Sequence, residues 1–326
     1  MDDEHAANAT RQTAETAART ENGVENRQNP PRRTRLHAGT RPAPMSSLPP
    51  AEPYAAERRV AEAAARAAAD FIRRHAGTLT EQDLRHKTVH DLVTFVDEGA
   101  QRIILDHLAA AFPDDAVLAE ESADGAAIPT AGRLWIVDPL DGTTNFTRGV
   151  PPYAVSVGLR VDAVATVGVV LDVSSGELFA ATRGAGLTVD GEPARVSETD
   201  TLDAALLATG FPFRDYAYVD GYLASFERAI RATRGVRRHG AASVDLAWTA
   251  AGRFDGYFEA GIAPWDVAAG VVLVEAAGGR VSGLWDGADP VLSGGIVASN
   301  GRLHDALCRI AAPLGNAYRA VHATPD

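Results

Sequence analysis

The chain of 326 residues contains one cysteine, Cys308, and one lysine, Lys87. A single cysteine excludes an internal disulfide and is typical of a reducing compartment, so a cytoplasmic protein is expected. The longest apolar stretch, residues 163–171, has about half the length that a bilayer-spanning helix needs. The first ten residues, MDDEHAANAT, are acidic and have no apolar segment, so no secretory signal is expected.

Positive charge is also scarce, because 31 basic residues stand against 43 acidic ones, and the formal net charge is -12. This balance argues against nucleic acid as a partner and favours a protein whose acidic groups attract cations. Since every other basic residue except histidine is an arginine, Lys87 stands out. Its compact ammonium group is not equivalent to a guanidinium fork. A lone lysine can also be a matter of chance.

Composition divides the chain into four parts. Residues 1–50 have almost nothing to bury and are expected to form a disordered tail. Met45, the only other methionine, stands just before the globular pattern, which makes it an alternative translation start. We expect an α+β half over 51–196, an α/β half over 197–315 and a flexible tail over 316–326.

Periodicity predicts an alanine-rich helix over 55–77, ended by Gly77, and a second helix over 97–112. Short strand-like runs separated by turn signals follow up to residue 182. After residue 200, strands alternate with helices to a closing helix over 301–310. The pattern predicts an α/β (α+β) protein with an antiparallel sheet in its first half and a mixed layered second half.

Acidic residues stand where strands or loops end or helices begin. Glu120 and Glu121 close the run AVLAEE, Asp138 and Asp141 lie in LWIVDPLDGTTNF, and Asp266 lies in PWDVAAG. Each has a plain alternative. An Asp-Gly pair such as Asp141-Gly142 is first of all a hairpin turn, a Glu-Glu pair is usually solvated, and Asp266 fits a helix cap. A turn does not explain Asp138, which ends an apolar strand.

If these carboxylates gather, they need a cation. Two carboxylates about 4 Å apart repel by roughly 4 kcal/mol at an effective dielectric constant near 20. The sequence has no cluster of cysteine or histidine for a zinc site, and oxygen ligands alone suit Mg²⁺, Mn²⁺ or Ca²⁺. Gly142, Thr143 and Thr144 can open a helix whose N–H groups bind an anion. With two metal ions, one activates the attacking water and the other stabilises the leaving oxygen.

Six segments, in order between about residues 57 and 312, resemble the inositol monophosphatase family. They are KTVHDLVTFVD, VLAEES, DPLDGTTNF, TGFPFR, GAASVDLAWTAAGRFDGYFE and APWDVAAGVVLVEAAGG. The resemblance implies a layered αβαβα sugar-phosphatase fold and a homodimer. It also implies Mg²⁺-dependent, often lithium-inhibited hydrolysis of a small phosphorylated polyol, with two or three Mg²⁺ ions.

The resemblance also assigns residues. It implies that Glu120, Asp138 and the Leu140 carbonyl hold the first metal ion, and that Asp138, Asp141 and Asp266 hold the second. Glu120 and Thr143 position the water, and Asp97 ties Thr143 into this network. Lys87 sits beside the phosphate. The implied substrate-binding residues are Gly142, Thr143, Thr144, Arg238 and Glu259.

Two departures from the family pattern concern the substrate. The loop KTVHD is one residue shorter than in animal members and closer to bacterial ones. Ala241 stands where many members carry serine or threonine, so the resemblance implies no side-chain hydrogen bond from this position to the substrate. We expect myo-inositol monophosphate as substrate. Fructose 1,6-bisphosphate, histidinol phosphate and 3′-phosphoadenosine 5′-phosphate are alternatives, and a regulatory binding protein with the same fold is an alternative of another class.

Overall fold

The computed structural model describes residues 52–322 except 89–90, 124, 126–127 and 213. These residues belong to one compact unit that extends over 49–326. The predicted disordered tail, residues 1–50, and the alternative start at Met45 lie outside the described residues.

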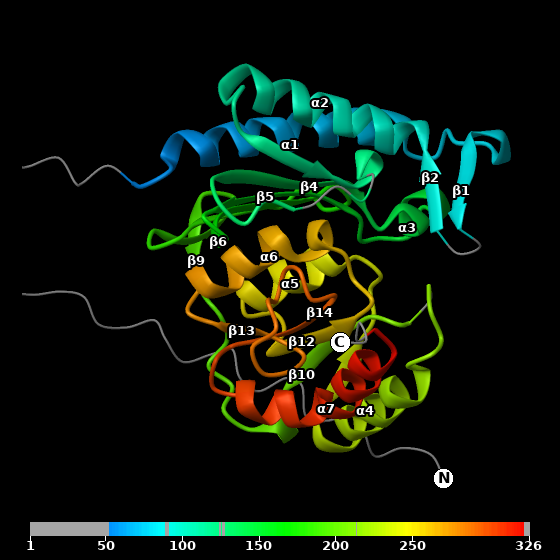
Figure 1. Cartoon of the computed structure of the whole chain (residues 1–326), viewed down its shortest axis with the longest axis vertical. Helices are drawn as coiled ribbons and strands as arrows, with labels where there is room; N and C mark the ends of the chain where they lie inside the picture. The colour runs from blue at the N-terminus through cyan, green and yellow to red at the C-terminus, as the bar shows by residue number, and fades with distance from the viewer. Residues whose placement is uncertain (1–51, 89–90, 124, 126–127, 213, 323–326) are drawn as a thin grey trace, which may run out of the picture. The chain divides into compact units, whose positions relative to one another are not determined.

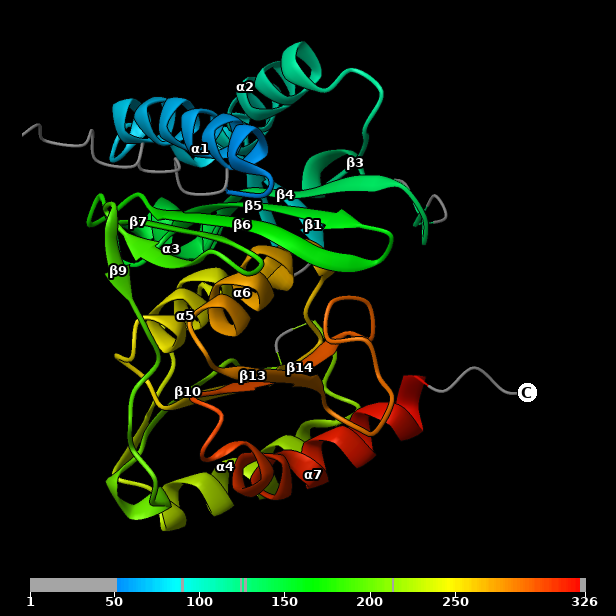
Figure 2. The same cartoon turned by 90° about the vertical axis from the view of Figure 1, so that its left-hand side faces the viewer.

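The described residues form five layers, helices alternating with sheets (Figure 1). The helices are α1 Ala55–His75, α2 Phe95–Ala111, α3 Thr143–Arg148, α4 Val219–Ala232, α5 Ala242–Ala250, α6 Pro264–Ala276 and α7 His304–His322. Figure 2 shows α1 and α2 on one side of the larger sheet, α5 and α6 between the two sheets, and α4 and α7 on the far side of the smaller sheet. This is the αβαβα layering that the family resemblance implies.

The larger sheet has seven strands in sequence order, with β3 and β4 parallel and the other pairs antiparallel. The strands are β3 Ala116–Ala119, β4 Arg133–Asp141, β5 Ala154–Val161, β6 Val164–Asp172, β7 Leu178–Thr182, β8 Gly186–Val189 and β9 Glu192–Ala194. Helices cover both faces of its centre, so β4, β5 and β6 are almost wholly buried. The antiparallel sheet predicted for the first half is confirmed.

The smaller sheet has the order β11-β10-β12-β14-β13, in which β11, β10 and β12 are parallel and the other pairs antiparallel. The strands are β10 Leu206–Thr209, β11 Gly235–Arg237, β12 Gly256–Ala260, β13 Arg280–Gly283 and β14 Gly295–Ser299. This mixed sheet matches the layered second half that the sequence predicts. The larger sheet lies wholly before residue 197 and the smaller one wholly after it.

The two N-terminal helices form where the sequence predicts them. Helix α1 buries a continuous alanine stripe, including Ala61, Ala65 and Ala68, against the rest of the core. Helix α2 begins two residues before the predicted start, because Thr94 caps it and accepts a hydrogen bond of 3.0 Å from Val96 N.

The C-terminal helix is longer than the sequence predicts. Helix α7 continues to His322, so the prediction of a flexible tail from residue 316 is wrong for 316–322, while 323–326 lie outside the described residues. Pro313 signals a helix end, but Leu314 is fully buried and its N–H donates a hydrogen bond of 3.0 Å to Ser225 Oγ on α4. Tertiary packing on α4 therefore overrides the proline.

Candidate active site

Asp138 and Asp141 lie at the carboxyl end of β4, where pairing with β5 is irregular. Asp138 pairs with Ser156 and Asp141 pairs with Ala154, so three residue intervals on β4 lie opposite only two on β5. In a regular strand, side chains three positions apart point to opposite faces. The extra residue of this bulge re-aims the chain and turns both carboxylates to one side. Leu140 N donates a hydrogen bond of 3.0 Å to Asp138 Oδ1, which holds the turn.

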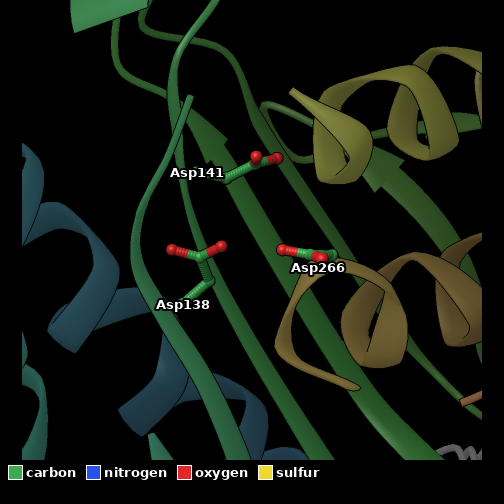
Figure 3. A group of neighbouring side chains, drawn as sticks. All are labelled: Asp138, Asp141 and Asp266. Atoms are coloured by element: carbon green, nitrogen blue, oxygen red, sulfur yellow. The ribbon is translucent and has the colours of Figure 1, made fainter. Parts of the chain in front are cut away.

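Asp266 approaches this pair from the facing layer. It lies in the first turn of α6, and its Oδ2 accepts a hydrogen bond of 2.6 Å from Ala263 N, so it caps the helix as its sequence context suggests. It also faces the bulge. One carboxylate oxygen from each of Asp138, Asp141 and Asp266 lies within 4.8 Å of the others, and Figure 3 shows the three carboxyl groups around one common space.

A network behind the cluster joins α2 to the start of α3. Thr143 Oγ1 lies 2.9 Å from Asp97 Oδ1 and 3.0 Å from the Leu140 carbonyl, and it can donate its single proton to either. Asp97 is buried, and its Oδ2 accepts hydrogen bonds of 2.8 and 2.6 Å from the backbone N–H and hydroxyl of Thr94. The link between Asp97 and Thr143 that the resemblance implies is therefore present in the geometry.

The carboxyl groups of the cluster bind protons more tightly than usual, because burial and mutual repulsion both favour their neutral forms. Burial is the largest cause, and it raises the pKa of Asp138 well above its usual range, with Glu120, Asp141 and Asp266 adding to the shift. Burial likewise raises the pKa of Asp141 to about 7 and that of Asp266 to about 7. At neutral pH this cluster is short of positive charge.

One pocket of about 380 Å³ contains the cluster and most of the predicted site. The predicted residues in its lining are Glu120, Asp138, Leu140, Asp141, Gly142, Thr143, Thr144, Arg238, Glu259 and Asp266. Asp97 lies behind Thr143 rather than in the lining. The side chain of Lys87 lies outside the described part of the chain, so its role stays a prediction.

Gly142 connects the carboxylates to α3 in a conformation that needs glycine. Its φ is +86°, in the left-handed region, and a Cβ there would lie 3.2 Å from the Pro152 carbonyl oxygen and 3.4 Å from Ala241 Cβ. A side chain would therefore meet both strain and contact. The glycine lets the backbone at the start of α3 approach Pro152 and Ala241 closely.

The far wall carries Glu259 and Arg238. Glu259, on β12, is hydrogen-bonded to the Tyr257 hydroxyl, and burial raises its pKa to about 8. Gly210 makes room for it, since a Cβ on Gly210 would overlap the Glu259 carboxylate. Arg238 is exposed at the mouth, where its guanidinium carbon lies 5.0 Å from the centre of the Phe211 ring.

Sequence reasoning missed several residues that line or support the pocket. Arg214 and Tyr216 line it, and Arg214 belongs to the segment TGFPFR, which could have drawn attention to it. Asn145 Nδ2 donates hydrogen bonds of 2.8 Å to the carbonyl oxygens of Pro152 and His239, and so joins α3 to the opposite wall. No local signal marks Ser243, which contacts Asp141 from α5.

The donor set fits a hard divalent cation. The three clustered groups are all carboxylates, and the described part of the chain shows no cysteine or histidine among them. Oxygen ligands of this kind suit Mg²⁺, Mn²⁺ or Ca²⁺. A cation would also compensate the charge that the raised pKa values reflect.

A layered αβαβα fold with this carboxylate cluster defines a class of protein built for metal-dependent chemistry. The model of the inositol monophosphatase family matches residues 55–315, and the chain belongs to this family. The family is metal-dependent, and the Asp138, Asp141 and Asp266 cluster is a site that could bind metal.

The similar proteins include some called Nus factor SuhB and one called inositol-1-monophosphatase. The protein called Nus factor SuhB of Pseudomonas aeruginosa is 42% identical over 254 residues, which cover 76% of this chain and 93% of the relative. The inositol-1-monophosphatase of Synechocystis sp. is 43% identical over 217 residues, covering 67% and 75% respectively. Extragenic suppressor protein suhB from Bartonella henselae is a similar solved structure, with a TM-score of 0.72, 34% identity, and coverage of 79% of this chain and 98% of that one.

These names affect the expected partners. The expectation that nucleic acid is an unlikely partner is not supported, because several relatives are called Nus factors. Within the described residues, no helix combines the length and apolarity that a membrane crossing requires.

Proposed function

We propose that the chain is a Mg²⁺-dependent phosphomonoesterase that hydrolyses myo-inositol monophosphate to inositol and phosphate. The observation that carries the proposal is the convergence of Asp138, Asp141 and Asp266 within 4.8 Å, in the same pocket as Gly142 and Thr143. Family membership and the Synechocystis relative support the reaction. The three aspartates, Glu120 and the Leu140 carbonyl would hold two or three ions.

The metal ions, when bound, supply a Lewis acid that activates water and stabilises the leaving oxygen. Glu120 and Thr143 orient the attacking water, and Thr143 is itself oriented by Asp97 at 2.9 Å. The backbone N–H groups of Gly142 and Thr143, with the Thr144 side chain, receive the phosphate at the start of α3. Lys87 is proposed to lie beside the phosphate.

Glu259 and Arg238 contact the alcohol part of the substrate. Because the pKa of Glu259 is raised to about 8, its carboxyl group is largely protonated at neutral pH and can donate as well as accept a hydrogen bond. Ring hydroxyls of a polyol also donate and accept, so they suit this wall of the pocket. A substrate without hydroxyls cannot make these hydrogen bonds. We therefore expect the pocket to bind such a substrate more weakly.

A substrate panel tests the proposal. Purified protein is assayed with Mg²⁺, with and without Li⁺, against myo-inositol 1-phosphate, fructose 1,6-bisphosphate, histidinol phosphate and 3′-phosphoadenosine 5′-phosphate. We expect the highest kcat/KM for inositol phosphate, no turnover after chelation of the metal, and inhibition by Li⁺. Negligible turnover of inositol phosphate beside rapid turnover of another member of the panel would reassign the substrate.

A second candidate function is a regulatory role, which the relatives called Nus factor SuhB favour. Under it the same fold binds RNA or the transcription machinery, with or without phosphatase activity. Filter binding of labelled RNA and pull-down of purified RNA polymerase test this role directly. A variant without turnover, such as Asp138→Asn, should keep such binding if the two functions are separate.

We also propose that the protein is a homodimer, as the family resemblance implies, and that it is cytoplasmic, as the single cysteine suggests. Light scattering coupled to size-exclusion chromatography measures the mass in solution. A monomer at micromolar concentration would contradict the homodimer and would leave the proposed chemistry untouched.

A further inference from the structure

Ser243 contacts the metal-site carboxylate Asp141 across the two halves of the chain. Its hydroxyl donates a hydrogen bond of 2.6 Å to Asp141 Oδ2, and its backbone N–H donates another of 2.8 Å to the same oxygen. Ser243 is fully buried and lies in the first turn of α5, 102 residues after Asp141 in the sequence. Ser243 is not among the proposed metal-binding or substrate-binding residues, although it makes both of these hydrogen bonds.

The helix that carries Ser243 is itself held in place. Asp245 lies two residues further along α5 and is 2% exposed. Its Oδ1 is 2.7 Å from Nδ1 of His239. The His239 ring packs against both Trp248 and Phe254, with ring centres 5.1 and 5.4 Å away, and these two rings also contact each other. The donors on Ser243 are therefore presented from a rigid frame, which is what orientation of a metal ligand requires.

Both hydrogen bonds go to one oxygen of the carboxylate. Bonds of this kind to an ionised group are roughly twice as strong as those between neutral groups. They hold the carboxyl plane in one orientation and favour the charged form that a metal ion needs. Two donors already occupy Oδ2, so Oδ1 is the oxygen left to the ion.

We propose that Ser243 is a positioning residue for metal binding, which holds Asp141 Oδ2 so that Oδ1 serves as the single ligand atom of this carboxylate. The proposal rests on the proposed metal-dependent function for its catalytic consequence, but the effect on ion binding stands without turnover. The start of α5, in the second half of the chain, then influences the affinity for the metal ion. The bulged strand β4, which carries Asp138 and Asp141, belongs to the first half.

A purely structural role for Ser243 has a different signature. If the hydroxyl only stabilised the start of α5, its removal would lower thermal stability and leave the affinity for the ion unchanged. Partners that orient metal ligands typically change metal affinity by about 10- to 100-fold when they are removed. The two roles are therefore separated by measuring affinity and stability on the same variants.

The test uses Ser243→Ala, Ser243→Thr and a matched control, Thr249→Val. Thr249 lies on the same helix, is fully buried, and donates its hydroxyl 2.8 Å to the Asp245 carbonyl, away from Asp141. Binding of Mg²⁺ and Mn²⁺ to metal-stripped full-length protein is measured by titration calorimetry. We expect about 10-fold weaker binding in Ser243→Ala, recovery in Ser243→Thr, which keeps the hydroxyl, and wild-type affinity in Thr249→Val.

Turnover as a function of Mg²⁺ concentration gives a second readout. The half-saturating Mg²⁺ concentration should rise in Ser243→Ala, while kcat at saturating Mg²⁺ changes little. Wild-type affinity in folded Ser243→Ala, or an equal loss in Thr249→Val, would overturn the proposal. If Ser243→Ala does not fold, loss of ion binding in folded Ser243→Thr would overturn it as well. A wild-type protein that binds ions but hydrolyses no phosphate monoester contradicts the proposed function alone.

Discussion

The two ends of the pocket are built differently. At the carboxylate end, Asp138 and Asp141 are 1% and 8% exposed, and each is held by donors from a strand bulge or a helix start. At the mouth, Phe211 is 44% and Tyr216 is 57% exposed, and Arg238 rests on the Phe211 ring. One end is fixed by packing, whereas the other faces solvent.

The difference separates chemistry from selection. Rigid, buried ligands hold the geometry that a metal-dependent reaction needs, and small displacements there cost activity. Exposed side chains at a mouth change binding more than chemistry, since they remain hydrated and mobile. Substitutions should therefore have large effects on turnover at the carboxylate end and small effects on KM at the mouth.

Asp138→Asn is expected to have the largest effect. Asp138 is the most buried member of the cluster and is proposed to bridge two ions. Its loss should lower kcat/KM by at least about 100-fold, the upper range for residues that only support a metal ligand. The folded state without metal should be retained or stabilised, because a charge repulsion is removed. Steady-state kinetics and thermal melting of the same preparation measure both effects, and retention of most activity would contradict the bridging role.

Stability without metal should fall as pH rises. The pKa values of Asp141 and Asp266 are about 7 in the folded protein, against about 3.9 for an unfolded aspartate. Between about pH 4 and 7 the folded state then binds more protons than the unfolded state, so the stabilising contribution is full below pH 4 and is lost as pH rises through 7. We expect a lower melting temperature at pH 8 than at pH 5.5, with chelator present.

Mg²⁺ should restore stability at pH 8, since a ligand that binds only the folded state stabilises it. Other groups also titrate, including Glu177, whose pKa the hydrogen bond from Arg253 lowers. Asp138→Asn is therefore the reference, because its pH dependence should be shallower than that of the wild type. Equal pH dependence in the two proteins would show that the cluster is not the cause.

Local sequence predicts the carboxylate end well because its geometry is mostly local. The segment DPLDGTT contains the strand end, the bulge and the helix start, so the positions of Asp138, Asp141 and Thr143 follow from one short stretch. Asp266 follows from its helix start in the same way. Their convergence does not follow from spacing, and it was the family resemblance that implied it.

Contacts between distant segments could not be predicted. The bonds from Ser243 to Asp141 depend on how packing on α6 places the start of α5 beside the end of β4, and no pattern in GAASVDLA indicates them. The extension of α7 past Pro313 likewise depends on burial of Leu314 and on a bond to Ser225. Propensity and periodicity contain neither piece of information.

Glu259→Ala tests the wall between the two ends. It removes the partner of the buried Tyr257 hydroxyl and the group proposed to bind polyol hydroxyls. We expect kcat/KM to fall by about 10-fold for inositol phosphate, because a lost hydrogen bond worth about 1.4 kcal/mol has this effect. For a simple aryl phosphate, kcat/KM should change little. Glu259→Gln is the control, since it keeps a neutral hydrogen-bonding group of the same shape. Equal loss for both substrates would assign Glu259 to the metal end.

Arg238→Ala should have the smallest effect. Arg238 is exposed, and a hydrogen bond from an exposed side chain to the substrate contributes about 0.5–1 kcal/mol to binding. We expect KM for inositol phosphate to rise by about twofold to fivefold with kcat unchanged, which corresponds to a free energy of that size. The neighbouring Arg237→Ala is the control, because Arg237 is also exposed but does not line the pocket. A fall in kcat as large as that of Asp138→Asn would contradict the separation of the two ends, because an exposed cation would then control the chemistry.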